Sequence, residues 1–538
     1  MYNQYKLYQH TQFSTLKQLL YLSAETHKTN TAFMFKKGKA IVSISYSKFG
    51  SEVNALGTYF YKQGFRNCHI AIYGENSYEW ILSYFSVTCG ENVAVPIDKE
   101  LDANGIAELL LDSDSRVLIY SGTYQDIVEQ LQKREPKIAC INMKDIPVFI
   151  NKGTELIEKG YVDYLNAEVI KEDLATIVYT SGTTGKSKGV MLTHGNLTID
   201  SYSACCNVSV YGPSILMLPL HHTFALVAAV FSEMVYGYPI YINRSLKRLQ
   251  KDFQISKPQN FFAVPLIAET LYKNIWISAK KQGKDKALKW LIKISNVLRA
   301  CKIDLRRTLF KSVLSAFGGR LDLIICGGAP LNQELVKAFD SIGITMLNGY
   351  GITECSPIVA VNRNQFNIIG SVGVPLCCNE IKIADNGEIL VKGDNVMVGY
   401  YHNEAENEKA FMDGWFRTGD IGFIDEHGAL HITGRIKNLI ILSNGENIPA
   451  ESIEEAVYTI PYVKEVVAYG KDNVIVAEVF LDEDVLDAKD RINADIQTIN
   501  KKLPLVRNIG KVVVRDTEFE KTTTKKIKRN YGGNQNDR

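Results

Sequence analysis

The feature that most constrains this chain is a polar loop, Thr180 to Gly189, directly after the β-branched run Thr176–Tyr179. Glycine lets the backbone approach a ligand closely, and the loop adds hydroxyl donors and two cations. These groups together suit phosphate binding better than an ordinary surface turn. The P-loop pattern does not fit, because its first glycine would fall at Thr180. The candidate phosphate-binding residues are Thr180, Ser181, Gly182, Thr183, Thr184, Gly185, Lys186 and Lys188.

The hydrophobic pattern from Tyr46 to Ser121 alternates between helical and strand periods. It predicts helices at 46–63, 77–88 and 106–112, and strands at 69–73, 93–97 and 117–120. Strands separated by helices indicate a parallel sheet covered on both faces. Such sheets bind ligands at the carboxyl ends of their strands, and we expect the Thr180 loop to lie at one of these ends.

The size and composition of the chain limit its class. With 538 residues it is too long for one ordinary core, and 46% hydrophobic and 22% charged residues are typical of a globular protein. A net charge of +2 gives no indication of nucleic acid as a partner. Ten cysteines without a C-x-x-C pair favour a reducing cytoplasm over a zinc site or a disulfide framework. Since no signal peptide or long apolar run is present, we expect at most peripheral membrane association.

Two glycine motifs follow predicted strands in the middle of the chain. Gly327–Leu331 follows the strand 323–326, and Leu347–Glu354 ends another strand about twenty residues later. Tyr350 can offer an aromatic face, Thr353 a hydroxyl, and Glu354 a hard oxygen ligand for Mg²⁺. These residues are candidates for a second part of a nucleotide site.

Two adjacent histidines, His221 and His222, lie in the apolar segment Leu218–Ala225. In such a setting histidines more often pack or cap than catalyse, so both interpretations stay open. No third ligand is spaced nearby, and we therefore expect no metal at this pair.

A basic amphipathic segment spans 280–311 and holds eleven Lys or Arg residues against Asp285 and Asp304. The simplest interpretation is a solvated helical face. The alternative is a docking surface for a membrane, for an acidic carrier protein, or for the phosphates of CoA. The sequence does not separate these possibilities.

The composition changes to a small α+β pattern after Gly434. It predicts a helix at 451–456 and a hairpin with strands at 463–469 and 474–481. We therefore predict two domains, 1–434 and 435–538. Near the end, Glu520–Arg529 is rich in lysine, which by itself is typical of a solvated tail.

With these motifs in order, the chain resembles the adenylate-forming superfamily of acyl-CoA synthetases, peptide-synthetase adenylation domains and luciferases. The segment Tyr179–Val190 matches the signature loop of that family, and five motifs match between about residues 15 and 530. The resemblance implies an α/β fold: a large N-terminal domain with parallel-rich sheets and helices in several layers, joined by a hinge to a small α+β domain.

The resemblance also implies roles at matching positions. His222 would lie near the reacting carboxylate, and Thr353 would contact the α-phosphate. Lys526 would be the catalytic lysine, although Lys525 stands where the family has glycine. Glu354 and Thr184 would hold Mg²⁺, with Glu354 also counted as catalytic. The remaining residues implied to bind ATP or AMP are Gly328, Ala329, Pro330, Gly349, Tyr350, Gly351, Asp420 and Arg435.

For the second domain, the resemblance implies that Lys437 is the hinge. After rotation of the domain, the segment Ser443, Asn444 and Gly445 would line a tunnel for the thiol substrate. An enlarged basic segment at 280–311 is typical of the fatty acyl-CoA synthetases in the family, which favours an aliphatic acid.

The implied activity is an acid–thiol ligase that works in two steps with ATP and Mg²⁺. A carboxylic acid, expected to be a medium- to long-chain fatty acid, becomes an acyl-adenylate, and the acyl group then passes to the thiol of CoA. One alternative transfers an acyl, aryl or amino acid to the phosphopantetheine of a carrier protein. An alternative of another class is a non-catalytic adenylate-binding protein. The sequence leaves the acid, the thiol acceptor and the oligomeric state open.

Overall fold

The structure is a computed structural model that describes residues 6–181, 187–442, 447–482, 484–485, 487–521, 527 and 529. The chain divides into two compact units. The first unit is formed within 1–380, 391–416 and 427–429, and the second within 381–390, 417–426 and 430–538. The predicted small domain, 435–538, lies inside the second unit, which also takes in two earlier segments.

A seven-stranded sheet of the first unit contains the predicted parallel strands. β3, β4 and β5 pair in parallel, and β7 continues this pairing on the far side of β4. The order is β18 (Gly399–Tyr400), β8 (Ser187–Thr193), β7 (Leu174–Ser181), β4 (Val93–Ile97), β3 (His69–Tyr73), β5 (Ser115–Tyr120), β6 (Ala139–Asn142). β8 and β18 are antiparallel to their neighbours. The sheet is therefore mixed at one edge.

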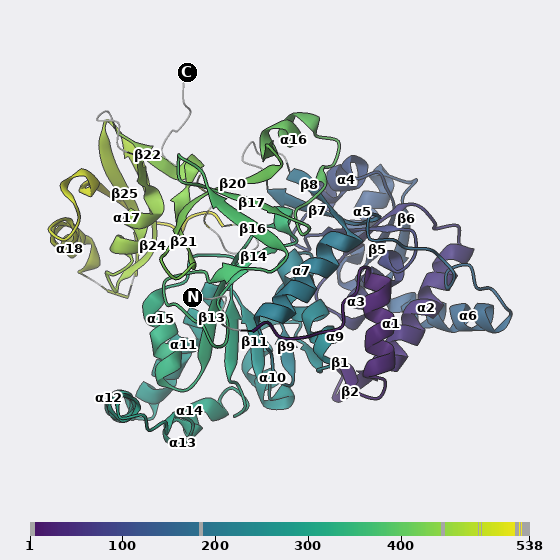
Figure 1. The fold of residues 1–538 in the computed structure, drawn as a ribbon, viewed down its shortest axis with the longest axis horizontal. Coiled ribbons are helices and arrows are strands. Elements are labelled where there is room, and N and C mark those ends of the chain that lie inside the picture. The colour runs from purple at the N-terminus through teal and green to yellow at the C-terminus, as the bar shows by residue number, and fades with distance from the viewer. Residues whose placement is uncertain are drawn as a thin grey trace. The chain divides into compact units, whose positions relative to one another are not determined.

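Helices of the first unit begin where short polar side chains can cap them. Ser77 accepts a hydrogen bond from the Trp80 N–H at the start of α3 (Tyr78–Thr88), and Asp102 caps α4 (Ala103–Asp112) in the same way. α2 (Tyr46–Lys62) packs on α3 and on α6 (Ile146–Glu158) (Figure 1). The other helices that precede β7 are α1 (Leu16–Thr26) and α5 (Gln125–Arg134).

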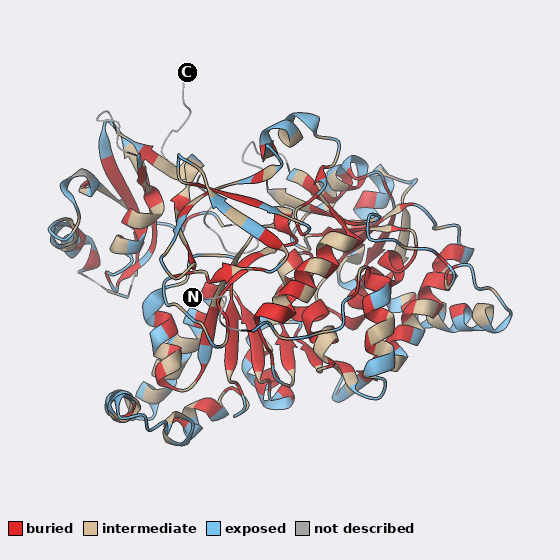
Figure 2. Ribbon diagram, viewed as in Figure 1, coloured by how far each residue is buried: buried red, intermediate tan, exposed pale blue. Residues whose placement is uncertain are grey.

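A nine-stranded sheet carries both glycine motifs. Its order is β15 (Val374–Pro375), β14 (Ile358–Val361), β13 (Thr345–Gly351), β12 (Leu323–Cys326), β11 (Asn260–Ala263), β9 (Ser214–Leu216), β10 (Ile240–Ile242), β1 (Thr31–Lys37), β2 (Ala40–Ser45). The strands from β13 through β1 pair in parallel, whereas β14, β15 and β2 pair antiparallel. Figure 2 shows the central strands buried, as expected for a sheet covered on both faces.

The remaining helices of the first unit complete the layers. They are α7 (His194–Asn207), α8 (Thr223–Leu226), α9 (Ser232–Tyr236), α10 (Leu249–Ser256), α11 (Pro265–Lys281), α12 (Asp285–Ala300), α13 (Arg306–Leu309), α14 (Lys311–Ser315), α15 (Gln333–Ser341) and α16 (Glu404–Ala410). One turn of π-helix, Val227–Phe231, joins α8 to α9. None of the helices in the described part of the chain combines the length and apolar character that a bilayer crossing requires.

The second unit has its own core. The predicted hairpin is formed by β24 (Val463–Lys471) and β25 (Val474–Leu481), with β26 (Ile509–Arg515) parallel to β25. Asp472 and Asn473 close it with φ angles of 51° and 58°, as a tight two-residue turn needs. α17 (Ala450–Val457) and α18 (Ala488–Asn500) pack into the same core. The predicted fold class, an α/β chain with parallel-rich sheets and a separate C-terminal sheet, is confirmed.

Shorter strands make up the remaining sheets. β16 (Asn379–Ile383), β17 (Glu388–Gly393), β20 (Trp415–Ile424) and β21 (Leu430–Arg435) all contribute residues to the second unit, and β19 (Phe411–Met412) pairs with β20. A two-stranded ladder joins β22 (Leu439–Ile441) to β23 (Asn447–Pro449).

Candidate active site

The described ends of the predicted phosphate loop belong to strands rather than to a loop. We predicted a loop from Thr180 to Gly189, but β7 extends to Ser181 and β8 begins at Ser187. Thr180 lies opposite Lys188 in the antiparallel ladder, so Lys188 is a strand residue. The extension follows from pairing between the two strands, in which Ser181 also lies opposite Ser187, and local sequence does not specify that pairing. Gly182, Thr183, Thr184, Gly185 and Lys186 lie outside the described residues, and their roles stay predictions.

Lys188 has partners of its own. Its ammonium group forms an ion pair with Glu406 of α16 and lies 5.0 Å from the centroid of the Tyr400 ring. The hydrogen bond from Lys188 lowers the pKa of the Glu406 carboxyl. A role for Lys188 in phosphate binding stays a prediction, and such a role would have to compete with this pair.

Glu354 is held in place at the end of β13. It belongs to a single 3₁₀ turn, Thr353–Cys355, and its Oε1 accepts a hydrogen bond from the Tyr400 hydroxyl at 2.9 Å. Burial, together with the Glu354 charge, raises the pKa of Tyr400. Tyr400 therefore stays protonated and donates. This half-buried carboxylate, oriented by a fixed donor, suits Mg²⁺, which typically uses one or two carboxylates together with substrate phosphates.

The structure brings the two glycine motifs together. β12 and β13 are adjacent parallel strands with Cys326 paired to Asn348, so both motifs begin at the carboxyl ends of neighbouring strands. Gly328 has a φ of 85°, which favours glycine in the turn that also contains Ala329 and Pro330. At Gly351 a Cβ would lie 2.1 Å from the Pro357 carbonyl oxygen. The first glycine serves a turn, and the second serves close packing.

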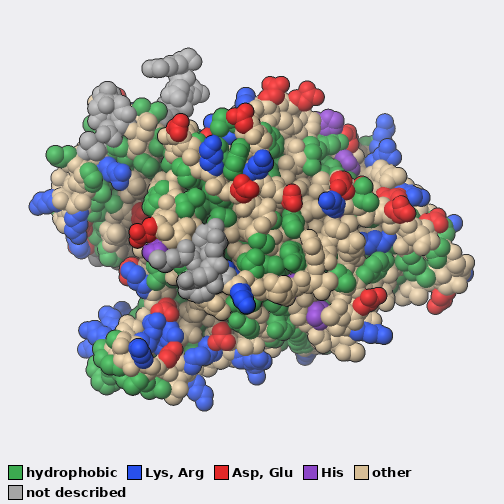
Figure 3. Space-filling view, in the orientation of Figure 1, with side chains coloured by type: hydrophobic (Ala, Val, Ile, Leu, Met, Phe, Trp, Pro, Cys, Tyr) green, Lys and Arg blue, Asp and Glu red, His purple; other side chains and the backbone are tan. Residues whose placement is uncertain are grey.

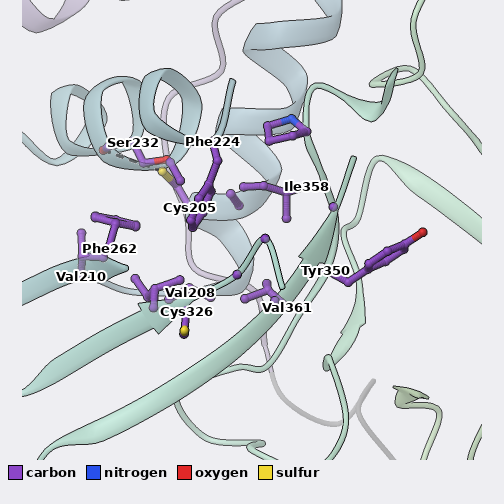
Figure 4. A pocket seen from close by; sticks show the side chains of 18 of the residues that line it. Cys205, Val208, Val210, Phe224, Ser232, Phe262, Cys326, Tyr350, Ile358 and Val361 are labelled. Carbon is purple, nitrogen blue, oxygen red and sulfur yellow. Dashed lines mark hydrogen bonds between the residues drawn. The ribbon is translucent and has the colours of Figure 1, made fainter. Parts of the chain in front are cut away.

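An apolar pocket opens beside these glycines. It holds about 690 Å³ of empty space up to and including its mouth. Gly327, Gly328 and Gly349–Gly351 form one part of its lining. Figure 4 shows the side chains of Phe224, Cys205, Val208 and Val361 converging on the cavity, while the Tyr350 ring points away from it. Two different surfaces therefore meet at one strand end, an apolar cavity and a backbone-lined turn.

The end of α7 is fixed beside this pocket by Tyr236. The Tyr236 hydroxyl donates to the backbone oxygens of Cys205 at 3.1 Å and Val208 at 2.9 Å. Burial raises the pKa of Tyr236, so the phenol keeps its proton. Both acceptor residues line the pocket, and the wall that they form is held by hydrogen bonds as well as by packing.

The two histidines lie in a loop that Asn76 holds from the other sheet. The Asn76 side chain donates to Leu218 O at 2.8 Å and accepts from Leu220 N at 3.1 Å. His222 is the residue before α8 and is half-buried, and its ring centroid lies 4.1 Å from that of His221. The implied role of His222 near the reacting carboxylate stays a prediction.

His221 gives this site a testable pH dependence. It is buried, and its Nε2 lies 3.6 Å from Asp98 Oδ1. Burial, and to a smaller extent the charge of Lys99, lowers the pKa of His221 to about 4. The unfolded chain, with an ordinary pKa of about 6.5, takes up the proton first as the pH falls. We expect the free energy of unfolding to drop by about 3 kcal/mol between about pH 6.5 and 4, with no further loss from His221 below that range.

Urea titrations of the wild type and of His221→Asn across this pH range measure the effect. In His221→Asn the free energy of unfolding should change less with pH than in the wild type. The control is His402→Asn, at an exposed position, which should not flatten the curve. Parallel curves for the wild type and His221→Asn would contradict the assignment.

In the second unit, Asp420 and Arg435 form a pair. Asp420 is buried, lies opposite Arg435 in the β20–β21 ladder, and accepts from Arg435 Nε at 2.5 Å. Lys437 follows in a one-turn 3₁₀ helix, Ile436–Asn438, and burial lowers its pKa. The roles of these residues in ribose binding and as a hinge stay predictions. Ser443, Asn444, Gly445 and Lys526 lie outside the described residues.

Described residues on both sides of Lys526 are anchored in the second unit. Lys521 pairs with Glu465 and forms an isolated antiparallel bridge to Ile527. Arg529 Nη2 donates to Glu454 Oε2 at 2.5 Å.

Several residues of the candidate site were missed from the sequence. Tyr400 and Glu354 are 46 positions apart and Asn76 and Leu218 are 142 apart, so no local motif joins them. Pocket residues such as Val208 and Phe262 lie in ordinary apolar runs. For these residues the sequence pattern indicates only a buried segment.

Comparison with known proteins establishes the family. The family described as AMP-binding enzyme matches residues 20–401. The long-chain-fatty-acid–CoA ligase FadD15 of Mycobacterium bovis is 30% identical over 431 residues, covering 74% of this chain and 70% of that protein. The chloroplastic long-chain-fatty-acid–[acyl-carrier-protein] ligase AEE15 of Arabidopsis thaliana is 28% identical over 512 residues, covering 75% and 67%.

A solved structure shows the same fold. The o-succinylbenzoate CoA synthetase MenE of Bacillus subtilis, in complex with an acyl-adenylate, has a TM-score of 0.75 at 22% identity, covering 95% of this chain and 96% of that one. The chain described here belongs to the family of AMP-binding enzymes. The resemblance to adenylate-forming enzymes is confirmed, and with it the prediction of an enzyme of the acid–thiol ligase class.

Proposed function

We propose that this enzyme uses ATP and Mg²⁺ to activate a medium- or long-chain aliphatic acid, and transfers the acyl group to the thiol of CoA. A carboxylate is a poor acylating agent, whereas its mixed anhydride with AMP has a good leaving group. Pyrophosphate leaves in the first step and AMP in the second. The contribution of the protein to the first step is mainly neutralisation of charge at the phosphates.

The observation that carries the proposal is the apolar pocket at the two glycine motifs. Among the described residues, those that line it include no Asp, Glu, Lys, Arg or His. An amino acid would bury its ammonium group there without a partner, which is costly. An alkyl chain would gain from burial, by about 0.8 kcal/mol per methylene. We propose that the carboxylate lies beside the backbone turn at Gly327–Gly328, which lines the pocket.

We propose roles for individual residues of the first unit, and separately for Asp420 and Arg435 of the second. Glu354, oriented by the Tyr400 hydroxyl, is the Mg²⁺ ligand, and Thr353 on the same turn contacts the α-phosphate. The Tyr350 ring, which points away from the apolar cavity, is proposed to stack on adenine. Asp420 and Arg435 bind the ribose. This requires that the pair separates, or that the Asp420 carboxylate accepts from the ribose hydroxyls while it stays bound to Arg435.

The thiol acceptor has two candidates among the relatives. The similarity to the CoA ligase FadD15 supports CoA, and the segment from Leu442 to Glu451 resembles CoA ligases. The similarity to AEE15 supports a carrier protein as the alternative. All ten cysteines are free thiols, in agreement with a reducing compartment such as the cytoplasm.

A panel of acids tests the proposed substrate. Acid-dependent exchange of pyrophosphate into ATP should give a higher kcat/KM for C8 to C16 fatty acids than for benzoates or amino acids. Thioester formation with CoA and with acyl carrier protein then identifies the acceptor. Higher kcat/KM for benzoates or amino acids than for every fatty acid would overturn the proposed acid.

The variant Ala228→Leu links this preference to the pocket. Ala228 is buried and lines the cavity from the π-helical turn, so added methylenes should occupy space needed by the acid. We expect kcat/KM for C16 to fall about 10-fold or more relative to C8, on the scale of one to a few methylenes in an apolar pocket. The KM for ATP is the control and should not change. Equal losses for both acids would argue against this pocket as the acyl site.

A further inference from the structure

The surface helix α12 presents an unusual outward face. Residues 286, 290, 293 and 297 recur at helical spacing and form one stripe, flanked by 289. The opposite side, with buried Leu288 and Ser295, packs into the core of the first unit. We call the exposed side chains the α12 face; they are Lys286, Lys289, Trp290, Lys293 and Val297.

The apolar members of the α12 face are unusually exposed. Trp290 is 63% exposed and Val297 is 64% exposed, two turns apart on the same stripe. The other tryptophans, Trp80, Trp276 and Trp415, are buried or half-buried. Single exposed apolar residues need no explanation. Here, however, an exposed tryptophan lies between lysines and is aligned with a second exposed apolar side chain, so the two form part of one surface.

The basic segment divides into two parts with different roles. Arg299 and Arg306 pair with Asp340, and Arg307 pairs with Asp322, so these arginines fasten the segment to the rest of the first unit. In the described part of the chain, by contrast, no ion pair involves any of the lysines at 280, 281, 284, 286, 289 and 293. The positive charge of these six lysines is therefore available to a partner.

Figure 3 shows the resulting surface. Lys and Arg side chains gather at the lower left, where Figure 1 places α12 and α13, and hydrophobic side chains lie between them. Figure 2 shows the same helices mostly exposed or intermediate. A positive, outward-facing helix surface with apolar side chains among the charges calls for an anionic partner that also accepts apolar groups.

We propose that the α12 face docks on an anionic lipid surface, with Trp290 and Val297 entering the boundary between headgroups and acyl chains. Tryptophan suits this level of a bilayer because its ring is apolar and its N–H is polar. Lysines reach lipid phosphates by extending their flexible stems. The cations of this face are all lysines, which suit mobile headgroups, whereas the arginines make the fixed pairs with carboxylates.

The test uses the intact chain and vesicles of phosphatidylcholine with or without phosphatidylglycerol. The wild type should co-sediment with the anionic vesicles, less so as salt is raised, and not with phosphatidylcholine alone. The triple variant Lys286→Glu, Lys289→Glu, Lys293→Glu should weaken binding by ~10-fold or more. The matched control replaces three exposed lysines elsewhere, Lys133, Lys137 and Lys159, by Glu. This control variant should bind the anionic vesicles ~10-fold or more tightly than the α12 variant.

Tryptophan fluorescence tests the insertion itself. Emission should shift to shorter wavelength on vesicle binding and be quenched by brominated lipids, and Trp290→Ser should remove most of both signals. Equal loss of binding in the two triple variants, or unchanged signals in Trp290→Ser, would overturn the proposal. Failure to bind vesicles, together with salt-dependent binding of an acidic carrier protein that Lys286→Glu weakens, would replace the lipid with a protein.

The readout is independent of the acid that the enzyme activates. Each variant should retain wild-type pyrophosphate exchange in buffer without vesicles, which shows that it is folded. If the proposed substrate were wrong, vesicle binding and its dependence on the α12 face would still stand or fall by these measurements.

Discussion

Glu354→Gln should lower acid-dependent exchange of pyrophosphate into ATP at least ~10²-fold, the scale of losing one strong charge-stabilising contact. The change keeps the shape of the side chain and one oxygen acceptor for the Tyr400 hydroxyl, which donates to Glu354 Oε1 at 2.9 Å. What it removes is the negative charge proposed to hold Mg²⁺. The rate should be measured across a range of MgCl₂ concentrations, since a weakened metal site should raise the Mg²⁺ requirement.

Tyr400→Phe is the matched control for this prediction. It keeps the charge and removes only the donor that orients Glu354, so the loss should be smaller than in Glu354→Gln. Unchanged exchange in Glu354→Gln would remove the metal assignment. A larger loss in Tyr400→Phe than in Glu354→Gln would show that the contact matters for the fold of this turn rather than for the metal.

Lys526→Ala should lose adenylation by ~10²-fold or more, while still converting a supplied acyl-adenylate and thiol to thioester. The reason is the proposed rotation of the small domain. In this proposal the lysine neutralises charge between carboxylate and phosphate in the first step and is withdrawn in the second. Lys521 and Ile527, which flank this segment in the sequence, are both anchored in the second unit.

Two variants give the comparison. Lys525→Ala, at the position where the family has glycine, should keep adenylation. Lys437→Pro, in the 3₁₀ turn proposed as the hinge, should keep pyrophosphate exchange and lose thioester formation. Equal impairment of both half-reactions in Lys526→Ala, or loss of adenylation in Lys525→Ala instead, would show that the assumed register of this loop is wrong.

Elements with strong periodicity were predictable. The strand 69–73 and the helix capped by Ser77 match β3 and α3 because an apolar run and a short polar cap each determine structure locally. The hairpin β24–β25 was also predictable, although β24 extends to Lys471, two residues beyond the predicted strand, so that Asp472 and Asn473 form the turn. The extension of β7 and β8 was not predictable, because pairing between strands depends on partners that local sequence does not specify.

For the candidate site, the sequence indicated the backbone motifs but not their supports. The glycines at 327–328 and 349–351 follow apolar runs, and their convergence follows from the parallel pairing of β12 and β13. The Tyr400 hydroxyl, which orients Glu354, and the Asn76 amide, which hydrogen-bonds to the loop before the histidines, come from distant elements. The lysines of 280–293 and the arginines of 299–307 formed one basic run in the sequence, and only their ion pairs separate them.

The close approach at Gly351 affects how mutational scans of this enzyme should be interpreted. A methyl group there would meet a carbonyl oxygen at 2.1 Å, within the protein itself and without any nucleotide. An inactive Gly351→Ala protein would thus report damage to the β13–β14 junction, although the residue belongs to a motif that is proposed to bind nucleotide. At Gly328 the nearest obstacle is a Val264 methyl group at 3.6 Å, but the φ of 85° strains any other residue, so a substitution there also disturbs the backbone. Assigning lost activity to ligand contacts at this strand end therefore requires yield and melting temperature to be recorded beside each rate.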